Sequence, residues 1–230
     1  MAKLTLTTFL SLDGVMQAPG GPDEDRSGGF EYGGWTVPFA DEGMRQFIDE
    51  QFDRSAAFLL GRRTYDIFAA YWPKVTDPGN RIAGSLNARP KYVVSTTLES
   101  PEWHNTTVIS TDVAGEVARL KERTEGGELQ IHGSGALARS LMAHGLIDEY
   151  NLLVYPVVLG RGHRLFPEGG QPTAFERIGA RETRSGISVH TYRPAGPAEF
   201  SSFPRRTERA GTSRSAAPEG VFRAGPCPVR

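Results

Sequence analysis

Strands and helices alternate along the first 145 residues of this chain, and strands alone follow them. Two parallel strands need a long crossover, usually a helix, whereas antiparallel neighbours need only a short turn. Residues 148–160 are extended, and residues 175–194 read as two strands around Arg184, Ser185 and Gly186. The pattern predicts an α/β fold with a mixed, mostly parallel sheet, flanking helices and a C-terminal antiparallel hairpin.

The spacing of apolar residues assigns the individual elements before residue 145. The predicted strands are residues 3–12, 55–60, 91–96, 106–110 and 128–133, and the predicted helices are residues 40–52, 64–72, 112–124 and 136–145. Asp112 is expected to cap its helix, because its carboxylate can accept a hydrogen bond from the first turn. The Pro- and Gly-containing stretch 73–90 is expected to be a link.

The composition changes after residue 194. Residues 195–230 are dominated by Gly, Pro, Ser, Ala and Arg without hydrophobic periodicity. Such a segment cannot bury enough apolar surface to offset the entropy lost on ordering. We therefore expect one domain at residues 1–194 and a disordered tail at residues 195–230.

The charge and cysteine counts exclude several classes of protein. A formal net charge of -1 offers no broad basic surface, so we expect no nucleic-acid partner, and any anion site must be local. Cys227 is the single cysteine, and the five histidines lack ligand-like spacing, so we expect no metal. No stretch approaches about 18 apolar residues, and the first ten residues lack a signal-peptide pattern. We expect a cytoplasmic protein without a membrane partner.

A Gly-Ser-Gly step separates the strand at 128–133 from the helix that follows it. The first amides of a helix have no partner within the helix and lie at the positive end of its dipole, which suits a phosphate. The candidate phosphate-binding residues are Gly133, Ser134, Gly135, Ala136 and Leu137. The same turn also occurs for structural reasons alone, and neither the G-x-G-x-x-G nor the Walker pattern is complete here.

Two further strands end in groups that can donate hydrogen bonds to an anion. One is followed by Gly61, Arg62, Arg63 and Thr64, and another ends at Ser95 and Thr96. Paired arginines suit phosphate, although arginines after a strand also occur simply as surface charges, and hydroxyls as turn residues. Because ligands of open α/β sheets bind outside the carboxyl ends of strands, these groups predict one elongated anionic ligand.

The order of these motifs resembles the dihydrofolate-reductase-like superfamily, most closely the C-terminal reductase domain of the bifunctional riboflavin-biosynthesis deaminase-reductase. The resemblance covers residues 3–194, and it is carried by TTFLSLDGVM, GGWTVP, LLGRRTYDIF, KYVVST and IHGSGALARSLMAHGLIDEYNLLVYPVVLGRGHRLF. It implies that NADPH lies across the sheet, its 2′-phosphate held by the arginine and hydroxyl residues and its pyrophosphate by the Gly-Ser-Gly turn. It also suggests a homodimer.

The substrate side follows from the same resemblance. Asp13, Trp35 and Asp41 are the candidate catalytic residues, with Trp35 beside the ring and one of the carboxylates guiding a proton. Asp41 comes one position later after the Trp-x-x-Pro step than the acid of dihydrofolate reductases does. Asp13 can equally be a turn residue, and Asp41 a complement to the helix dipole. The zinc-deaminase signature is absent.

The expected function is therefore an NADPH-dependent reductase that delivers hydride to a pyrimidine- or pterin-like small heterocycle, similar to 5-amino-6-(5-phosphoribosylamino)uracil reductase. Two alternatives stay open. The chain can be a diverged reductase of another carbonyl or pterin substrate, or a catalytically silent NADPH-binding module.

Overall fold

A computed structural model describes residues 1–202, and residues Met1–Ala198 form one compact unit. Its centre is an eight-stranded sheet in the order β4-β3-β2-β5-β1-β6-β8-β7. The strands are β1 (Leu4–Ser11), β2 (Ser55–Gly61), β3 (Lys91–Val94), β4 (Thr106–Ile109), β5 (Glu128–His132), β6 (Glu149–Tyr155), β7 (Thr173–Glu182) and β8 (Ser188–Pro197). β8 is antiparallel to both of its neighbours, and the other pairings are parallel. The predicted mostly parallel sheet with a C-terminal antiparallel hairpin is confirmed.

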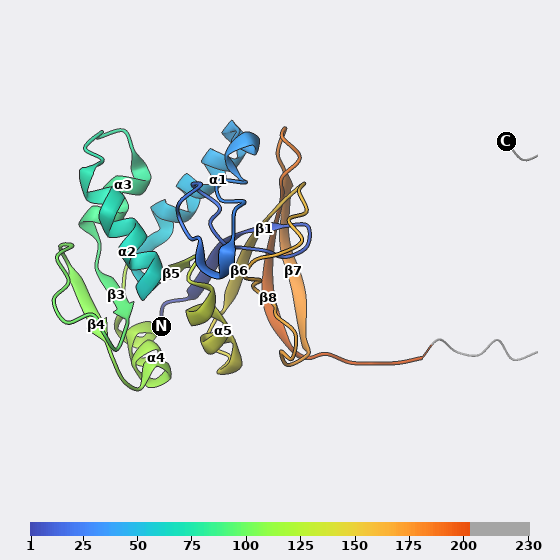
Figure 1. Ribbon diagram of the computed structural model, residues 1–230. Helices are drawn as coiled ribbons and strands as arrows, with labels where there is room; N and C mark the ends of the chain where they lie inside the picture. The colour runs from blue at the N-terminus through green and yellow to red at the C-terminus, as the bar shows by residue number, and fades with distance from the viewer. Residues whose placement is uncertain (203–230) are drawn as a thin grey trace, which may run out of the picture. The chain divides into compact units, whose positions relative to one another are not determined.

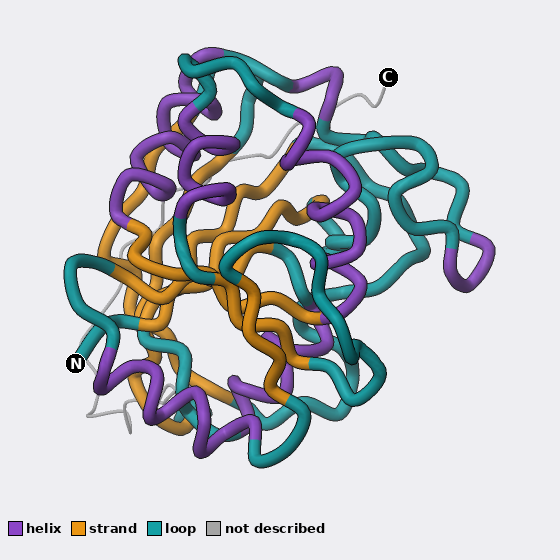
Figure 2. The backbone as a smooth tube through the Cα atoms, turned by 90° about the vertical axis from the view of Figure 1, so that its left-hand side faces the viewer, coloured by secondary structure: helices purple, strands orange, loops and turns teal. Residues whose placement is uncertain are grey.

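Helices cover both faces of this sheet (Figures 1 and 2). They are α1 (Glu42–Arg54), α2 (Arg62–Tyr71), α3 (Arg81–Ala88), α4 (Val113–Arg123) and α5 (Gly135–Ala143), with short 3-10 turns at Ser27–Gly29, Val37–Phe39 and Trp72–Lys74. Figure 1 shows α1, α2 and α3 on one face and α4 and α5 on the other. Each face has its own apolar core, with Phe52 and Leu86 in the first and Leu120 and Leu141 in the second. No helix among residues 1–202 is long and apolar enough to cross a membrane.

Two local features differ from the sequence prediction. The link predicted at 73–90 contains α3, whose first turn is capped by Asn80, with the Oδ1 atom 2.9 Å from the Ala83 amide. Only Ala83 and Leu86 of this helix are buried, so its apolar periodicity is too short to stand out. The extended segment at 148–160 ends as a strand at Tyr155, because Pro156 cannot donate to a ladder.

Asp112 caps α4 as expected, its carboxylate accepting a hydrogen bond from the Gly115 amide. The outer hairpin runs to Pro197, three residues beyond the predicted end of the domain. Most of the predicted tail, residues 203–230, lies outside the described residues, and Cys227 lies there with it. The expected tail therefore stays a prediction.

Candidate active site

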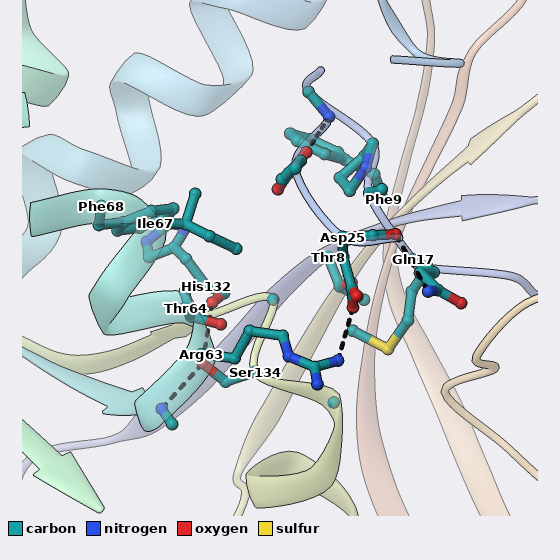
Figure 3. A pocket seen from close by; sticks show the side chains of 18 of the residues that line it. Thr8, Phe9, Gln17, Asp25, Arg63, Thr64, Ile67, Phe68, His132 and Ser134 are labelled. Atoms are coloured by element: carbon teal, nitrogen blue, oxygen red, sulfur yellow. Dashed lines mark hydrogen bonds and ion pairs between the residues drawn. The ribbon is translucent and has the colours of Figure 1, made fainter. Parts of the chain in front are cut away.

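A cavity of about 670 Å³ opens where β1, β2 and β5 end (Figure 3). This volume falls within the range of roughly 300–1,000 Å³ that is usual for small-molecule sites. All of the predicted cofactor residues line it except Ser95 and Thr96. The sheet order explains this, because β2, β5 and β1 are consecutive neighbours and their carboxyl ends meet at one edge.

The Gly-Ser-Gly turn positions α5 with its amino end at the cavity. Ser134 has a left-handed backbone, and its hydroxyl accepts a 3.0 Å hydrogen bond from the Gly61 amide, which ties the end of β2 to this turn. The first hydrogen bond of the helix runs from the Ala138 amide to the Ser134 carbonyl at 2.9 Å. The amides of Gly135, Ala136 and Leu137 precede that bond, and these three residues line the cavity. Amides in this position have no partner within the helix, which is the arrangement that the predicted anion site requires.

The two adjacent arginines at the start of α2 point to different segments. The Arg62 Nε atom lies 2.9 Å from the carboxylate of Asp66, and its Nη1 atom lies 3.2 Å from the Thr97 hydroxyl beyond β3. The Arg63 Nη1 atom instead lies 2.8 Å from Asp25 Oδ2 and 2.9 Å from the Ser27 hydroxyl, both in the loop after β1 (Figure 3). Arg62 therefore faces the β3 side of the cavity, and Arg63 faces the loop side.

The predicted hydroxyl donors Ser95 and Thr96 lie outside the cavity lining. The Ser95 hydroxyl accepts hydrogen bonds from the amides of Thr97 and Leu98 at 3.2 and 3.1 Å, so it holds the turn after β3 together. Thr96 is exposed. The hydroxyl that reaches Arg62 belongs to Thr97, one residue beyond the predicted pair. Because Ser95, Thr96 and Thr97 lie in a turn beyond the end of β3, where side chains have no regular period, the spacing alone does not identify which hydroxyl faces the arginine.

Asp13 lies outside the cavity lining. Its carboxylate accepts hydrogen bonds from the Ser11 hydroxyl at 2.7 Å and from the amides of Leu159 and Gly160 at 3.1 and 2.9 Å. Burial raises the pKa of Asp13, but these hydrogen bonds outweigh burial and lower the pKa to about 2. A carboxyl group with so low a pKa is poorly suited to donate a proton. The structure therefore favours the alternative that Asp13 is a turn residue.

Asp41 also lies outside the cavity lining. It caps α1 through a 2.8 Å hydrogen bond from the Met44 amide, and it accepts hydrogen bonds at 2.9 Å from both the amide and the hydroxyl of Ser185. The Met44 and Ser185 amides hold the pKa of this carboxyl well below its usual range. Asp41 therefore joins α1 to the outer hairpin.

Trp35 is buried beside the cavity rather than in its lining. Its indole nitrogen donates a 2.8 Å hydrogen bond to the Gln17 carbonyl, and its ring meets Tyr155 edge to face at 5.4 Å. The predicted roles of Asp13, Asp41 and Trp35 in catalysis stay predictions, and the geometry gives each of them a structural role.

The loop after β1 contributes groups that the sequence did not single out. Glu24 and Asp25 line the cavity, as do Gln17 and His163, and the Gln17 Oε1 atom accepts a 3.0 Å hydrogen bond from the His163 amide. Burial raises the pKa of Glu24 despite hydrogen bonds from the Gly20 and Gly21 amides. The signal in the sequence is the length of the segment at residues 20–34, which is crowded with Gly, Pro, Asp and Glu, since long loops are often functional.

One wall of the cavity is apolar. It is formed by Ile48 and Phe52 of α1 and by Ile67 and Phe68 of α2 (Figure 3). A cavity lined both by polar donors and by an apolar wall suits a ligand with a charged part and a ring. Among residues 1–202 no group of three or more His, Cys, Asp or Glu side chains is arranged to hold a metal ion.

A model of the RibD C-terminal domain matches residues 2–189. The chain belongs to the RibD C-terminal domain family. This is a family of reductase domains of the kind found in riboflavin biosynthesis, so the family resemblance drawn from the sequence is confirmed. The uncharacterized protein YyaP of Bacillus subtilis strain 168 is 27% identical over 192 residues, which are 83% of this chain and 94% of that protein.

Solved structures show the same fold. A putative riboflavin biosynthesis protein from Shewanella sp. PV-4 superposes with a TM-score of 0.59 at 20% identity, covering 84% of this chain and 99% of that one. A second match is the Thermotoga maritima diaminohydroxyphosphoribosylaminopyrimidine deaminase/5-amino-6-(5-phosphoribosylamino)uracil reductase. Its TM-score is 0.55 at 14% sequence identity, and the match covers 84% of this chain and 56% of that one. A dihydrofolate reductase from Enterococcus faecalis, complexed with NADP(H), has a TM-score of 0.53 at 14% sequence identity. This match covers 84% of this chain and 96% of that one. The fold of this RibD C-terminal domain is therefore dihydrofolate-reductase-like.

Proposed function

We propose that this RibD C-terminal domain is an NADPH-dependent reductase of a pyrimidine- or pterin-like small molecule. The observation that carries the proposal is that the amino ends of α2 and α5 line one cavity together with an apolar wall. The amides of Gly135, Ala136 and Leu137 would hold a pyrophosphate, and Arg62 would pair with the 2′-phosphate on the β3 side. The residues present thus fit the cofactor, which when bound supplies a hydride.

The chain's own residues would orient the ring and supply a proton. The apolar side chains of α1 and α2 would exclude water from the ring. Hydride addition to the carbon of a C=N or C=O bond leaves negative charge on the nitrogen or oxygen, and that atom needs a proton from an acid nearby. Of the two carboxyl side chains that line the cavity, Asp25 is paired with Arg63, whereas the raised pKa of Glu24 favours a bound proton. We therefore expect Glu24, rather than Asp13 or Asp41, to be the proton-holding group.

We expect the purified protein to bind NADPH more tightly than NADH and to oxidise NADPH when a suitable heterocycle is added. Fluorescence titration measures the binding, and the loss of nicotinamide absorbance measures the turnover. Turnover should fall as the pH rises through the raised pKa of Glu24, because the acid must be protonated. Absence of NADPH binding would contradict the proposal.

A second function is a cofactor-binding module without turnover. The observation in its favour is that Asp13 and Asp41, the carboxylates expected to guide a proton, are held by other hydrogen bonds outside the cavity. This alternative predicts saturable NADPH binding with no oxidation in the presence of any pyrimidine or pterin. The same titration and absorbance measurements separate the two functions.

We further propose that the protein is a homodimer, associated through the outer strands of the sheet. Phe175 of β7 packs edge to face on Tyr150 at 5.1 Å and on Phe166 at 6.2 Å, and Phe166 is 47% exposed. Ile178 of β7 is exposed to the same extent, and exposed apolar side chains that join into one patch often mark an interface. Size-exclusion chromatography with light scattering should give twice the chain mass of 25.1 kDa, and a mass of one chain at micromolar concentrations would contradict it.

A further inference from the structure

A row of polar side chains crosses the middle of the sheet at one level. Thr7 of β1 is in register with His132 of β5 on one side and with Asn151 of β6 on the other, and Asn151 is in register with Thr191 of β8. His132, Thr7 and Asn151 are buried. Polar groups in a core cost free energy unless they are hydrogen-bonded, so three buried ones side by side on consecutive strands need a physical explanation.

Hydrogen bonds join Thr191, Asn151 and Thr7 of this row and define the orientation of the Asn151 amide. The Thr191 hydroxyl donates to Asn151 Oδ1 at 3.0 Å, and the Asn151 Nδ2 atom donates to Gln51 Oε1 at 3.1 Å and to the Thr7 hydroxyl at 3.4 Å. Because the Thr7 oxygen accepts from Asn151, its own proton is free to point elsewhere.

Gln130 fixes the tautomer of His132. The Gln130 Nε2 atom faces two acceptors, the Gln51 carbonyl at 2.7 Å and the Glu128 carboxylate at 3.0 Å, so it must be the nitrogen end of the amide. The other end, Oε1, lies 3.0 Å from His132 Nε2. A carbonyl oxygen can only accept, and therefore Nε2 carries the imidazole proton and Nδ1 carries a lone pair.

The His132 ring is held neutral at the cavity. It stacks on Phe52 at 4.4 Å, and burial lowers its pKa to about 3. His132, Phe52 and Thr7 all line the cavity. Register neighbours in adjacent strands lie roughly 4.8 Å apart, so the His132 acceptor and the Thr7 donor belong to one small patch of the lining.

We propose that His132 is a specificity-determining residue, whose Nδ1 atom accepts a hydrogen bond from a ring N–H of a neutral heterocycle bound against Phe52. Gln130 is the positioning residue that keeps Nδ1 unprotonated, and Thr7 donates to an oxygen of the same ring. This inference rests on the proposed function, since it concerns the ring end of the same cavity. It selects neutral rings with an N–H donor over rings that present only methylated nitrogens.

The test compares two probes that share one ring system and differ in whether its ring nitrogens carry hydrogen or methyl. Lumazine has ring N–H groups, and 1,3-dimethyllumazine has the same ring system with both of those nitrogens methylated. Calorimetric titration, with and without NADPH, should show that the wild-type protein binds lumazine about tenfold more tightly, as expected for one well-made hydrogen bond. Equal affinity for the two probes, or no saturable binding of lumazine, would overturn the inference.

Substitution links the preference to His132. His132→Phe keeps an aromatic ring against Phe52 and removes both nitrogens, so it should bind the two probes within about twofold of each other. His190→Phe is the matched control, because His190 on β8 is half-buried and lies outside the cavity lining, and it should keep the tenfold preference. A tenfold preference retained in His132→Phe would contradict the assignment.

A measurement on the unmutated protein covers the case in which His132→Phe does not fold. In a ¹⁵N-labelled sample, long-range ¹H–¹⁵N spectra should show His132 Nδ1 as an unprotonated nitrogen whose resonance moves when lumazine is added, while Gln130→Leu should give a mixture of tautomers. A protonated Nδ1 in the wild type would overturn the inference. Failure of NADPH to bind would contradict the proposed function alone, because the lumazine titration is also made without NADPH.

Discussion

Replacement of Arg62 by alanine should weaken NADPH binding about 100-fold and NADH binding only a few-fold. A guanidinium paired with phosphate is a charge-assisted interaction, for which losses of about 1.5–3 kcal/mol are usual. NADH lacks the 2′-phosphate, so most of this contribution is absent from its affinity. Fluorescence titration of both cofactors gives the ratio directly.

Arg81→Ala is the matched control for Arg62→Ala. Arg81 also begins a helix and pairs with a single aspartate, Asp53, at 2.7 Å, but it lies outside the cavity lining. Its loss should leave both cofactor affinities unchanged, since an exposed pair contributes little. Equal losses of NADPH and NADH affinity in Arg62→Ala would place the 2′-phosphate elsewhere, with Arg63 as the next candidate.

Asn151→Leu should lower the free energy of unfolding by about 3 kcal/mol. The leucine leaves the Thr191 hydroxyl without its acceptor and removes a donor to Gln51, and unpaired buried polar groups cost about 1–3 kcal/mol each. Urea unfolding followed by circular dichroism measures the change. We also expect weaker ligand binding, because the row of polar groups aligns Thr7 at the cavity.

Gln46→Leu provides the comparison for Asn151→Leu. Gln46 is exposed on α1, so the same exchange of an amide for leucine should change stability by no more than about 0.5 kcal/mol. If Asn151→Leu proves as stable as the wild type, the row is replaceable by apolar packing. The hydrogen bonds within the row would then not be what stabilises the fold at this position.

The residues proposed to hold the phosphates were placed at the cavity largely by patterns that the sequence shows. A Gly-Ser-Gly step before a helix, and arginines directly after a buried strand, are local patterns whose chemistry follows from backbone geometry. The alternation of strands and helices predicted the mostly parallel sheet, and parallel order brings strand ends to one edge. The Gly-Ser-Gly turn and the arginines after a strand depend on neighbours in the chain, so the sequence alone determines them.

The part of the cavity proposed to hold the ring was decided by the tertiary structure. Asp13 and Asp41 are candidates by position, but their partners Gly160 and Ser185 lie more than 140 residues away and hold them outside the cavity. Thr7 and His132 are unremarkable on their own strands, and only the pairing register places them side by side. Direction, tautomer and burial of a side chain depend on contacts between distant segments, which no spacing within the sequence specifies.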